Sequence, residues 1–217
     1  MMGPFRTLFL DLDDTLYPRS SGLWEALSQR ILAYLVQRLG LSEQEAEQLR
    51  HSYLETYGTT LKGLMTEHRI EPHDYLDFVH DVPVEEHLEP DAALAAMLRS
   101  LHPKRVVFSN ASRKHVDRVT HRLGVDREID LVVDIEALGY HNKPLPEAYL
   151  RAMALSGESS PPACLILDDR IQNLIPAGEL GMTTVLVGQD GQHPAADYRI
   201  SRAADLTRVI PSLVMGG

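Results

Sequence analysis

Residues 8–18 read Leu-Phe-Leu-Asp-Leu-Asp-Asp-Thr-Leu-Tyr-Pro, a short apolar run that ends in closely spaced carboxyl groups. Successive side chains of a strand point to opposite faces, so Asp11 and Asp13 would share a face if the strand continued. An unpaired carboxylate away from water is costly unless a metal or a cationic group offsets its charge. We therefore predict a buried strand whose end carries a nucleophile and a cation site. The alternative is a solvated acidic turn, because Asp and Thr are also common turn residues.

The composition predicts a soluble globular protein that is either one domain with a large insertion or two small domains. The chain has 217 residues, of which 44% are hydrophobic, and this is enough for a full core. No window approaches the roughly 20 apolar residues of a membrane span, and the first residues lack the features of a signal peptide. We expect a cytoplasmic protein without a membrane partner. The single cysteine, Cys164, lies in an apolar run, which predicts a buried thiol.

The charge balance bears on the class of partner. Lys and Arg number 21 against 31 Asp and Glu, a formal net charge of −10, and no block of consecutive basic residues occurs. A nucleic-acid backbone would be repelled, so we expect no nucleic-acid partner. A small anionic substrate is compatible if the cleft carries local positive charge. No heptad pattern indicates an assembly, which leaves a monomer or a homodimer open.

A change of periodicity after Pro18 predicts an all-helical insertion. Apolar residues recur every three or four positions over 23–39, and Ser42 with Glu45 forms a capping-box pattern that opens a second helix to about residue 57. Shorter helices are predicted over 61–65 and 74–80. Because no strand-like alternation occurs here, we expect residues 18–87 to form a helical cap, and 1–17 with 88–217 to form the core.

From residue 90 onward, helical and strand patterns alternate, which predicts an α/β fold with a doubly wound, Rossmann-like parallel sheet. The predicted helices cover 91–101, 113–123, 146–154 and 171–180. The predicted strands cover 105–108, 129–133, 164–167 and 183–187. The turn-rich segment 188–194 is predicted to be a flexible loop.

Polar residues follow several predicted strands, where open α/β sheets bind their ligands. Ser109 and Asn110 precede a helix, so a hydroxyl and backbone amides are placed to hold phosphoryl oxygens, although they are equally compatible with a helix cap. Lys143 precedes a proline that would restrict its loop, although a lone lysine is usually a solvated surface residue. Asp168 and Asp169 form a second acidic strand end. Two such ends supply the oxygen ligands that suit Mg²⁺.

These segments, in this order, resemble the motifs of the haloacid dehalogenase-like hydrolases over essentially the whole chain. The four matching segments are Asp11-Leu12-Asp13-Asp14-Thr15, then Ser109-Asn110, then Lys143-Pro144 with Pro146 and Tyr149, then Asp168-Asp169 with Asn173 and Gly181. Arg170 departs from the pattern, because a small hydroxyl residue is more usual after the paired acids. Segments 16–18 and 57–64 are similar to the pyrimidine 5′-nucleotidase-type branch, which has a helical cap.

The resemblance implies a Mg²⁺-dependent phosphatase that forms an aspartyl-phosphate. Asp11 would be the nucleophile, and Asp13 the general acid and base. The phosphoryl group would be bound by Thr15, Ser109, Asn110 and Lys143. Mg²⁺ would be held by Asp11, the Asp13 backbone carbonyl, and Asp168 or Asp169.

The substrate implied is a small phosphorylated metabolite, with nucleoside monophosphates first and phosphoglycolate, sugar phosphates or pyridoxal phosphate as alternatives. A phosphomutase of the same fold stays open. A 2-haloacid dehalogenase is disfavoured because of Asp13. The position two residues after the nucleophile is not acidic in the dehalogenases that the chain resembles. A noncatalytic binding protein is disfavoured because Asp11, Asp13 and Lys143 are all present.

Overall fold

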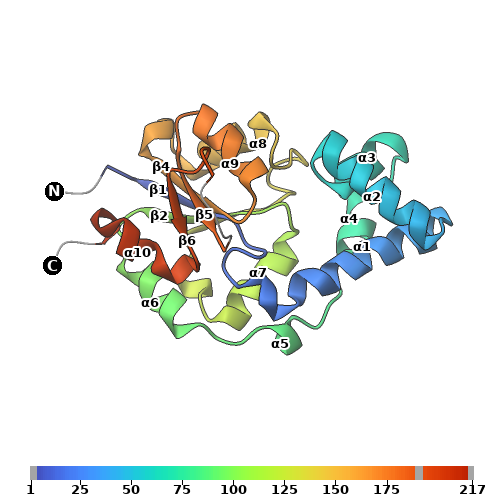
Figure 1. Ribbon diagram of the computed structural model, residues 1–217, viewed down its shortest axis with the longest axis horizontal. Helices are drawn as coiled ribbons and strands as arrows, with labels where there is room; N and C mark the ends of the chain where they lie inside the picture. The colour runs from blue at the N-terminus through green and yellow to red at the C-terminus, as the bar shows by residue number, and fades with distance from the viewer. Residues whose placement is uncertain (1–3, 189–192, 215–217) are drawn as a thin grey trace. The chain divides into compact units, whose positions relative to one another are not determined.

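The computed structural model describes residues 4–188 and 193–214, and the predicted loop at 188–194 lies largely outside this range. The chain divides into two compact units, Gly22–His87 and the described residues of Met1–Ser21 with Leu88–Gly217. Figure 1 shows that the first of these is built from helices and that the second contains the sheet.

The larger unit is built on six parallel strands in the order β3-β2-β1-β4-β5-β6, which confirms the predicted parallel sheet. Their bounds are β1 Thr7–Leu10, β2 Lys104–Phe108, β3 Leu131–Val133, β4 Cys164–Asp168, β5 Thr183–Val187 and β6 Tyr198–Ile200. Strand β1 is buried along its whole length, and its Leu10 lies opposite Val107 of β2 and Leu167 of β4. The carboxyl ends of three neighbouring strands therefore lie next to one another.

Helices cover both faces of this sheet (Figure 1), with α8 and α9 on one side and α6, α7 and α10 on the other. Their bounds are α6 Ala92–Ser100, α7 Arg113–Leu123, α8 Pro146–Ser156, α9 Ile171–Glu179 and α10 Leu206–Val209. Under α8, the Phe108 ring meets Phe9 and Tyr149 edge-on, with centroids 5.9 and 5.4 Å apart. Such buried aromatic pairs anchor β1 and β2 against the helix that follows the Lys143 loop.

Five helices form the smaller unit: α1 Leu23–Leu39, α2 Glu43–Tyr57, α3 Thr60–Glu67, α4 Pro72–Val79 and α5 Val84–His87. The predicted capping box is present, because Ser42 accepts from the Glu45 amide and the Glu45 carboxylate accepts from the Ser42 amide. Tyr34 packs edge-on against Tyr75, with centroids 5.0 Å apart. Aromatic and aliphatic side chains thus give this insertion its own core.

Short elements account for most differences from the predicted boundaries. Strand β6 and helices α5 and α10 have only three or four residues and were not predicted. Such lengths are too short for a hydrophobic pattern to repeat often enough to be recognised. Five 3₁₀ turns complete the described structure: Arg19–Ser21, Asp126–Glu128, Pro161–Ala163, Ala203–Asp205 and Pro211–Leu213.

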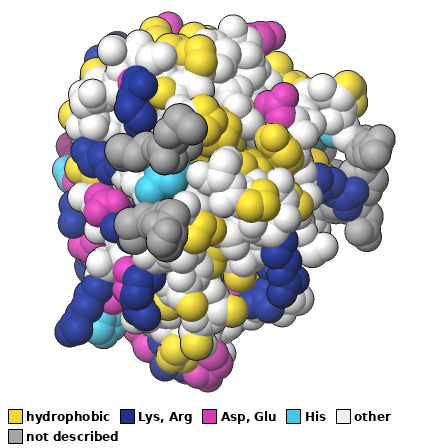
Figure 2. All heavy atoms as spheres, turned by 90° about the vertical axis from the view of Figure 1, so that its left-hand side faces the viewer, with side chains coloured by type: hydrophobic (Ala, Val, Ile, Leu, Met, Phe, Trp, Pro, Cys, Tyr) yellow, Lys and Arg dark blue, Asp and Glu magenta, His cyan; other side chains and the backbone are white. Residues whose placement is uncertain are grey.

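Two observations concern the expected absence of membrane and nucleic-acid partners. None of the described helices combines the length and the apolar composition that crossing a bilayer requires. On the face in Figure 2, basic side chains alternate with acidic and apolar ones and do not form a continuous stripe.

Candidate active site

A buried lysine joins the ends of two neighbouring strands. Asp11 follows β1 directly, Asp168 is the last residue of β4, and the Lys143 ammonium donates hydrogen bonds to both carboxylates at 2.7 Å. Only 1% of Lys143 is exposed to solvent, and Asp168 is fully buried. The predicted alternative of a solvated surface lysine is therefore wrong. Buried charges persist when they are paired and hydrogen-bonded in this way.

Burial and charge act in opposite directions on the two main groups of this site. Burial alone would lower the pKa of Lys143, but the Asp11 and Asp168 carboxylates outweigh it and raise that pKa. For Asp11, burial is the largest influence and raises the pKa to about 7 even though the Lys143 ammonium opposes it. The lysine is thus a permanent cation, and the Asp11 carboxylate needs further positive charge to be fully ionised.

The loop that carries Lys143 is held by an asparagine from the end of β2. The Asn110 side chain donates to the Lys143 carbonyl at 3.0 Å and accepts from the Lys143 amide at 2.8 Å. Asn142 donates to the same carbonyl at 2.9 Å, and the Lys143–Pro144 peptide bond is cis. The side chain of Asn110 therefore positions the lysine.

Ser109 and Asn110 do not cap the helix that follows them. The N-cap of α7 is Ser112, whose hydroxyl accepts from the His115 amide. The buried Ser109 hydroxyl accepts from the Ala111 amide at 3.1 Å, inside the turn after β2. The helix-cap interpretation is therefore wrong for both residues, although they do lie at the predicted sheet edge.

Thr15 links the two acidic strand ends. Its hydroxyl donates to Asp11 Oδ2 at 2.8 Å and accepts from the Asp169 amide at 3.0 Å. The chain reaches this position through Asp14, whose backbone is left-handed with φ of 59°. One hydroxyl therefore fixes the Asp11 carboxylate and the loop after β4 together.

Three carboxylates gather where a cation would bind. Ligand oxygens of Asp11, Asp168 and Asp169 lie within 4.8 Å of one another. Burial first, and then the neighbouring Asp11 and Asp168 carboxylates, raise the pKa of Asp169 to about 8. Lys143 offsets only one of these negative charges. A small divalent cation with a preference for oxygen ligands fits this donor set, which is the chemistry of Mg²⁺.

Asp168 accepts hydrogen bonds from several neighbouring groups. Besides Lys143, it accepts from the Asn173 side-chain amide at 2.9 and 3.0 Å and from the Arg170 amide at 2.9 Å. Arg170, the residue that departs from the family pattern, thus contributes through its backbone, and α9 begins there without a side-chain cap.

Asp13 faces a different set of partners, which the sequence did not predict. The Tyr17 hydroxyl donates to Asp13 Oδ1 at 2.6 Å, and Nε2 of His115 lies 3.0 Å from the same oxygen. His115 comes from the first turn of α7 and is fully buried. The Asp13 side chain does not belong to the carboxylate group described above.

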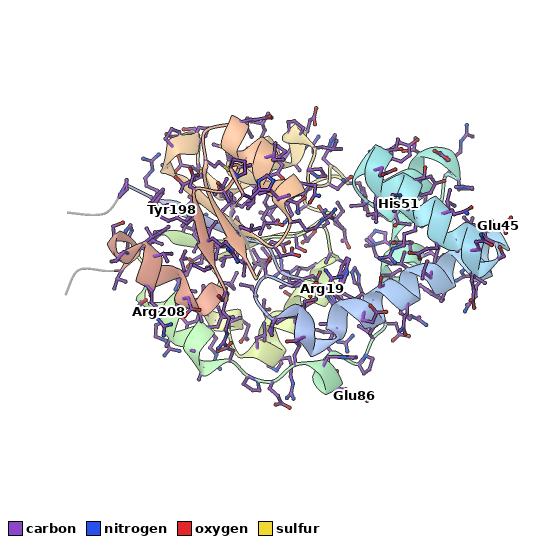
Figure 3. All side chains as sticks on the ribbon, in the orientation of Figure 1. Arg19, Glu45, His51, Glu86, Tyr198 and Arg208 are labelled. Carbon is purple, nitrogen blue, oxygen red and sulfur yellow. The ribbon has the colours of Figure 1, made fainter. Side chains whose placement is uncertain are left out.

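A cavity of about 300 Å³ adjoins the acidic loops. Its charged lining residues are Asp14, Asp91, Asp169, Arg19 and Arg202. The Arg19 side chain lies beside the loop after β1 (Figure 3), with its guanidinium 3.9 Å from the Asp14 carboxylate. Arg202 is likewise paired with the Asp91 carboxylate at 2.7 Å, so this lining has no excess of the positive charge that an anionic substrate needs.

The comparison with known families agrees with the motif order. The family model of the haloacid dehalogenase-like hydrolases matches residues 5–181. The chain belongs to this family. Phosphate metabolism protein 8 of Saccharomyces cerevisiae (strain ATCC 204508 / S288c) is 29% identical over 211 residues, which cover 89% of this chain and 63% of that protein. The chain thus spans less than two thirds of that relative.

Solved structures of several hydrolases share the fold. The HAD phosphatase from Thermococcus onnurineus aligns with a TM-score of 0.66 at 18% identity, covering 97% of this chain and all of that one. L-2-haloacid dehalogenase from Xanthobacter autotrophicus aligns with a TM-score of 0.62 at 17% identity, covering 95% and 98%. At such identities the likeness concerns the fold alone, and the two named activities differ. The side chains must therefore distinguish between them.

Proposed function

We propose that this hydrolase removes phosphate from small phosphorylated metabolites through a covalent aspartyl-phosphate. The observation that carries the proposal is the Lys143 ammonium held 2.7 Å from both Asp11 and Asp168, with Asp169 in the same carboxylate group. This arrangement gives an anionic nucleophile the positive charge it needs to approach an anionic phosphate. The name of the yeast relative, which refers to phosphate metabolism, is in keeping with it.

In the first step, an Asp11 oxygen attacks phosphorus and the bond to the ester oxygen breaks. Asp13 donates a proton to that leaving oxygen, so that it departs as an alcohol. In the second step, Asp13 takes a proton from the water that attacks the phosphorus of the intermediate. The Asp11 carboxylate and inorganic phosphate are then released, so atoms and charge balance over the two steps.

We assign Mg²⁺ to Asp11, Asp169 and the Asp13 backbone carbonyl. Asp168 already accepts from Lys143, Asn173 and the Arg170 amide, so its role is to hold the lysine. When bound, the metal supplies charge that screens the repulsion between carboxylate and phosphate.

Phosphoryl oxygens are assigned to the Lys143 ammonium, the Ser109 hydroxyl and the backbone amide of Asn110. The Thr15 hydroxyl, expected from the sequence to bind phosphate, already donates its only proton to Asp11 Oδ2. The Asn110 side chain is engaged with the Lys143 backbone, which leaves the backbone amide for this task. Donors placed where charge accumulates in the transition state stabilise it without reorganising.

For the substrate we propose a nucleoside 5′-monophosphate, a pyrimidine nucleotide first, with the helical unit Gly22–His87 acting as the cap that selects the leaving group. The support is the similarity of segments 16–18 and 57–64 to nucleotidases. Dehalogenation is disfavoured because attack on carbon has no use for a proton donor at Asp13, which two neighbouring side chains hold in place.

The deciding experiment is inorganic phosphate release from a panel of phosphate monoesters, with Mg²⁺ and with a chelator. We expect metal-dependent release that Asp11→Asn, purified in parallel, abolishes. Preference for UMP or CMP supports a nucleoside monophosphate as the substrate. Preference for phosphoglycolate or a sugar phosphate would instead assign the substrate to that class of ester. If no ester is hydrolysed, the phosphatase proposal fails, and phosphomutase and halide-release assays come next.

A further inference from the structure

We propose that Tyr17 and His115 are positioning residues that hold Asp13 for proton transfer to the leaving group. The inference rests on the proposed function, because it concerns the proton that the ester oxygen needs. Both side chains contact Asp13 Oδ1 and would act through Asp13.

The geometry concentrates both contacts on one oxygen. The Tyr17 hydroxyl donates to Asp13 Oδ1 at 2.6 Å, and His115 Nε2 lies 3.0 Å from that same atom. Two partners approaching one oxygen from different elements restrict rotation about the Cβ–Cγ bond of Asp13. The orientation of its second oxygen is then fixed as well. A defined direction matters because proton transfer requires hydrogen-bond distance to the reacting atom.

The environment keeps both partners in place. Tyr17 is 3% exposed and His115 is fully buried, whereas 15% of the Asp13 side chain reaches solvent. The Tyr17 phenol is the donor in its contact with Asp13 Oδ1. With the proton of the general acid on Oδ2, Asp13 Oδ1 is the acceptor for both partners, and this places the proton of His115 on Nε2.

The two contacts also connect separate parts of the fold. Tyr17 belongs to the loop after β1, four residues beyond Asp13, and His115 belongs to the first turn of α7. Ser112 caps that turn by accepting from the His115 amide at 3.4 Å. A short loop carrying the acid is thereby tied to a rigid helix. A purely structural tie would restrain the loop without changing how the reaction depends on the leaving group.

The test compares two esters of similar size that differ in their need for a proton. Benzyl phosphate must leave as an alcohol, whereas 4-nitrophenyl phosphate releases a stable phenolate. We measure kcat/KM, which covers steps up to phosphoryl transfer, for wild type, Tyr17→Phe and His115→Leu. We expect each substitution to lower kcat/KM about tenfold on benzyl phosphate and less than about threefold on the nitrophenyl ester. The tenfold loss is a part of the ~10²- to 10⁴-fold rate increase that a general acid supplies.

A conservative variant separates positioning from packing. His115→Gln retains an amide N–H close to the place of Nε2, so we expect it to recover most of the benzyl phosphate activity that His115→Leu loses. Thr120→Val removes a different buried hydrogen bond from the same helix, the 2.8 Å bond to the Val116 carbonyl, and should leave the ratio of the two esters unchanged.

The failures of the two proposals are distinguishable. If wild type hydrolyses neither ester nor any member of the panel, the phosphatase proposal itself fails and this inference falls with it. If wild type is active and Asp13→Asn lowers benzyl phosphate turnover selectively, but Tyr17→Phe and His115→Leu lower both esters equally or not at all, only the positioning role is overturned.

Discussion

Lys143 is the single residue on which the buried charges of this site depend. Replacement by methionine keeps most of the volume but removes the ammonium, so Asp11 and Asp168 are left without the cation that each contacts at 2.7 Å. Removing one partner of a buried ionic group costs about 3–5 kcal/mol. We expect Lys143→Met to lose about that much unfolding free energy at neutral pH, measured by denaturant titration, and to lose phosphate release.

The matched control is Lys104→Met. The Lys104 ammonium donates to the Ser156 carbonyl at 2.9 Å and holds no carboxylate of the site. We expect a loss below about 1 kcal/mol, the range of an ordinary hydrogen bond. If the two variants are equally stable, Lys143 is not balancing buried negative charge.

At the residue scale, the sequence predicted those site residues that lie in short, recognisable segments. Asp11 and Asp168–Asp169 end buried apolar runs, so their position at one sheet edge followed from strand topology. His115 could not be found in this way. It lies 102 residues from Asp13 in the sequence. A histidine on the buried face of a helix gives no sequence signal that would identify its hydrogen-bond partner. Likewise, the attachment of Asn110 to the Lys143 backbone depends on loop conformation.

At the scale of elements, helix α3 packs on α2 through a glycine. A Cβ at Gly63 would lie 2.3 Å from the Tyr53 ring, closer than atoms approach, whereas one at Gly178 in α9 would make an ordinary 3.8 Å contact with Thr184. Alanine favours a helix over glycine by up to about 1 kcal/mol. We expect Gly178→Ala to stabilise by part of that amount, and Gly63→Ala to destabilise by about 1–3 kcal/mol through overpacking.

Denaturant unfolding of both variants checks this prediction. The substitution is chemically the same and falls inside a helix in each case, so the opposite sign isolates the packing effect. Stabilisation by Gly63→Ala would mean that α2 and α3 do not approach as closely as described.

A charged pair joins the edge strand β3 to its neighbour β2. Arg105 forms a paired contact with Asp130 at 2.8 and 2.9 Å, and its hydrogen bond holds the pKa of Asp130 below the ordinary value. A depressed carboxyl pKa contributes stability above the unfolded value of about 3.9, and this contribution is lost as pH falls through the folded value. We expect Asp130→Asn to cost about 1 kcal/mol at pH 7 because the pair is partly exposed.

The pH series provides the check. The stability difference between wild type and Asp130→Asn should persist down to about pH 4 and shrink below it. Asp117→Asn is the control, because the pair of Asp117 with Arg113 is more than half exposed on both sides, and we expect less than about 0.5 kcal/mol. A difference that stays constant at low pH would exclude the ionised pair as its cause.

The elements themselves were predictable when they were long enough for a hydrophobic pattern to repeat. The helix at 113–123 and the strand at 183–187 have the predicted bounds. The predicted strand 129–133 shortened to Leu131–Val133, because residues 126–128 form a 3₁₀ turn and Asp130 is engaged with Arg105. Side-chain contacts of this kind determine where a strand begins, and the local hydrophobic pattern does not reveal them.

At the scale of the whole molecule, topology alone leaves the chemistry open. Structures named as a phosphatase and as a dehalogenase align with this chain to nearly the same extent, with TM-scores of 0.66 and 0.62. A parallel sheet brings strand ends together for any of these reactions, and the residues placed there decide which one occurs. Here, Asp13 with its two buried partners favours an oxygen leaving group that needs a proton.

We expect the same site to couple the stability of the whole chain to metal binding and pH. Burial raises the pKa of Asp11 to about 7 and that of Asp169 to about 8. A raised carboxyl pKa means that ionisation costs stability, a cost absent below the unfolded value of about 3.9 and fully present above the folded value. The metal-free protein should therefore lose stability as pH rises from about 4 to 8, and Mg²⁺ should offset this loss.

We expect the rise in Tm on adding Mg²⁺ in place of chelator to be larger at pH 8 than at pH 5, because ionised carboxylates bind the cation. At a metal concentration of 100 times Kd, binding contributes about 2.7 kcal/mol. Asp169→Asn should remove most of the rise and flatten the pH dependence of the metal-free protein. Asp130→Asn, on the far edge of the sheet, should retain both. A rise that is equal at the two pH values, or that survives in Asp169→Asn, would place the cation elsewhere.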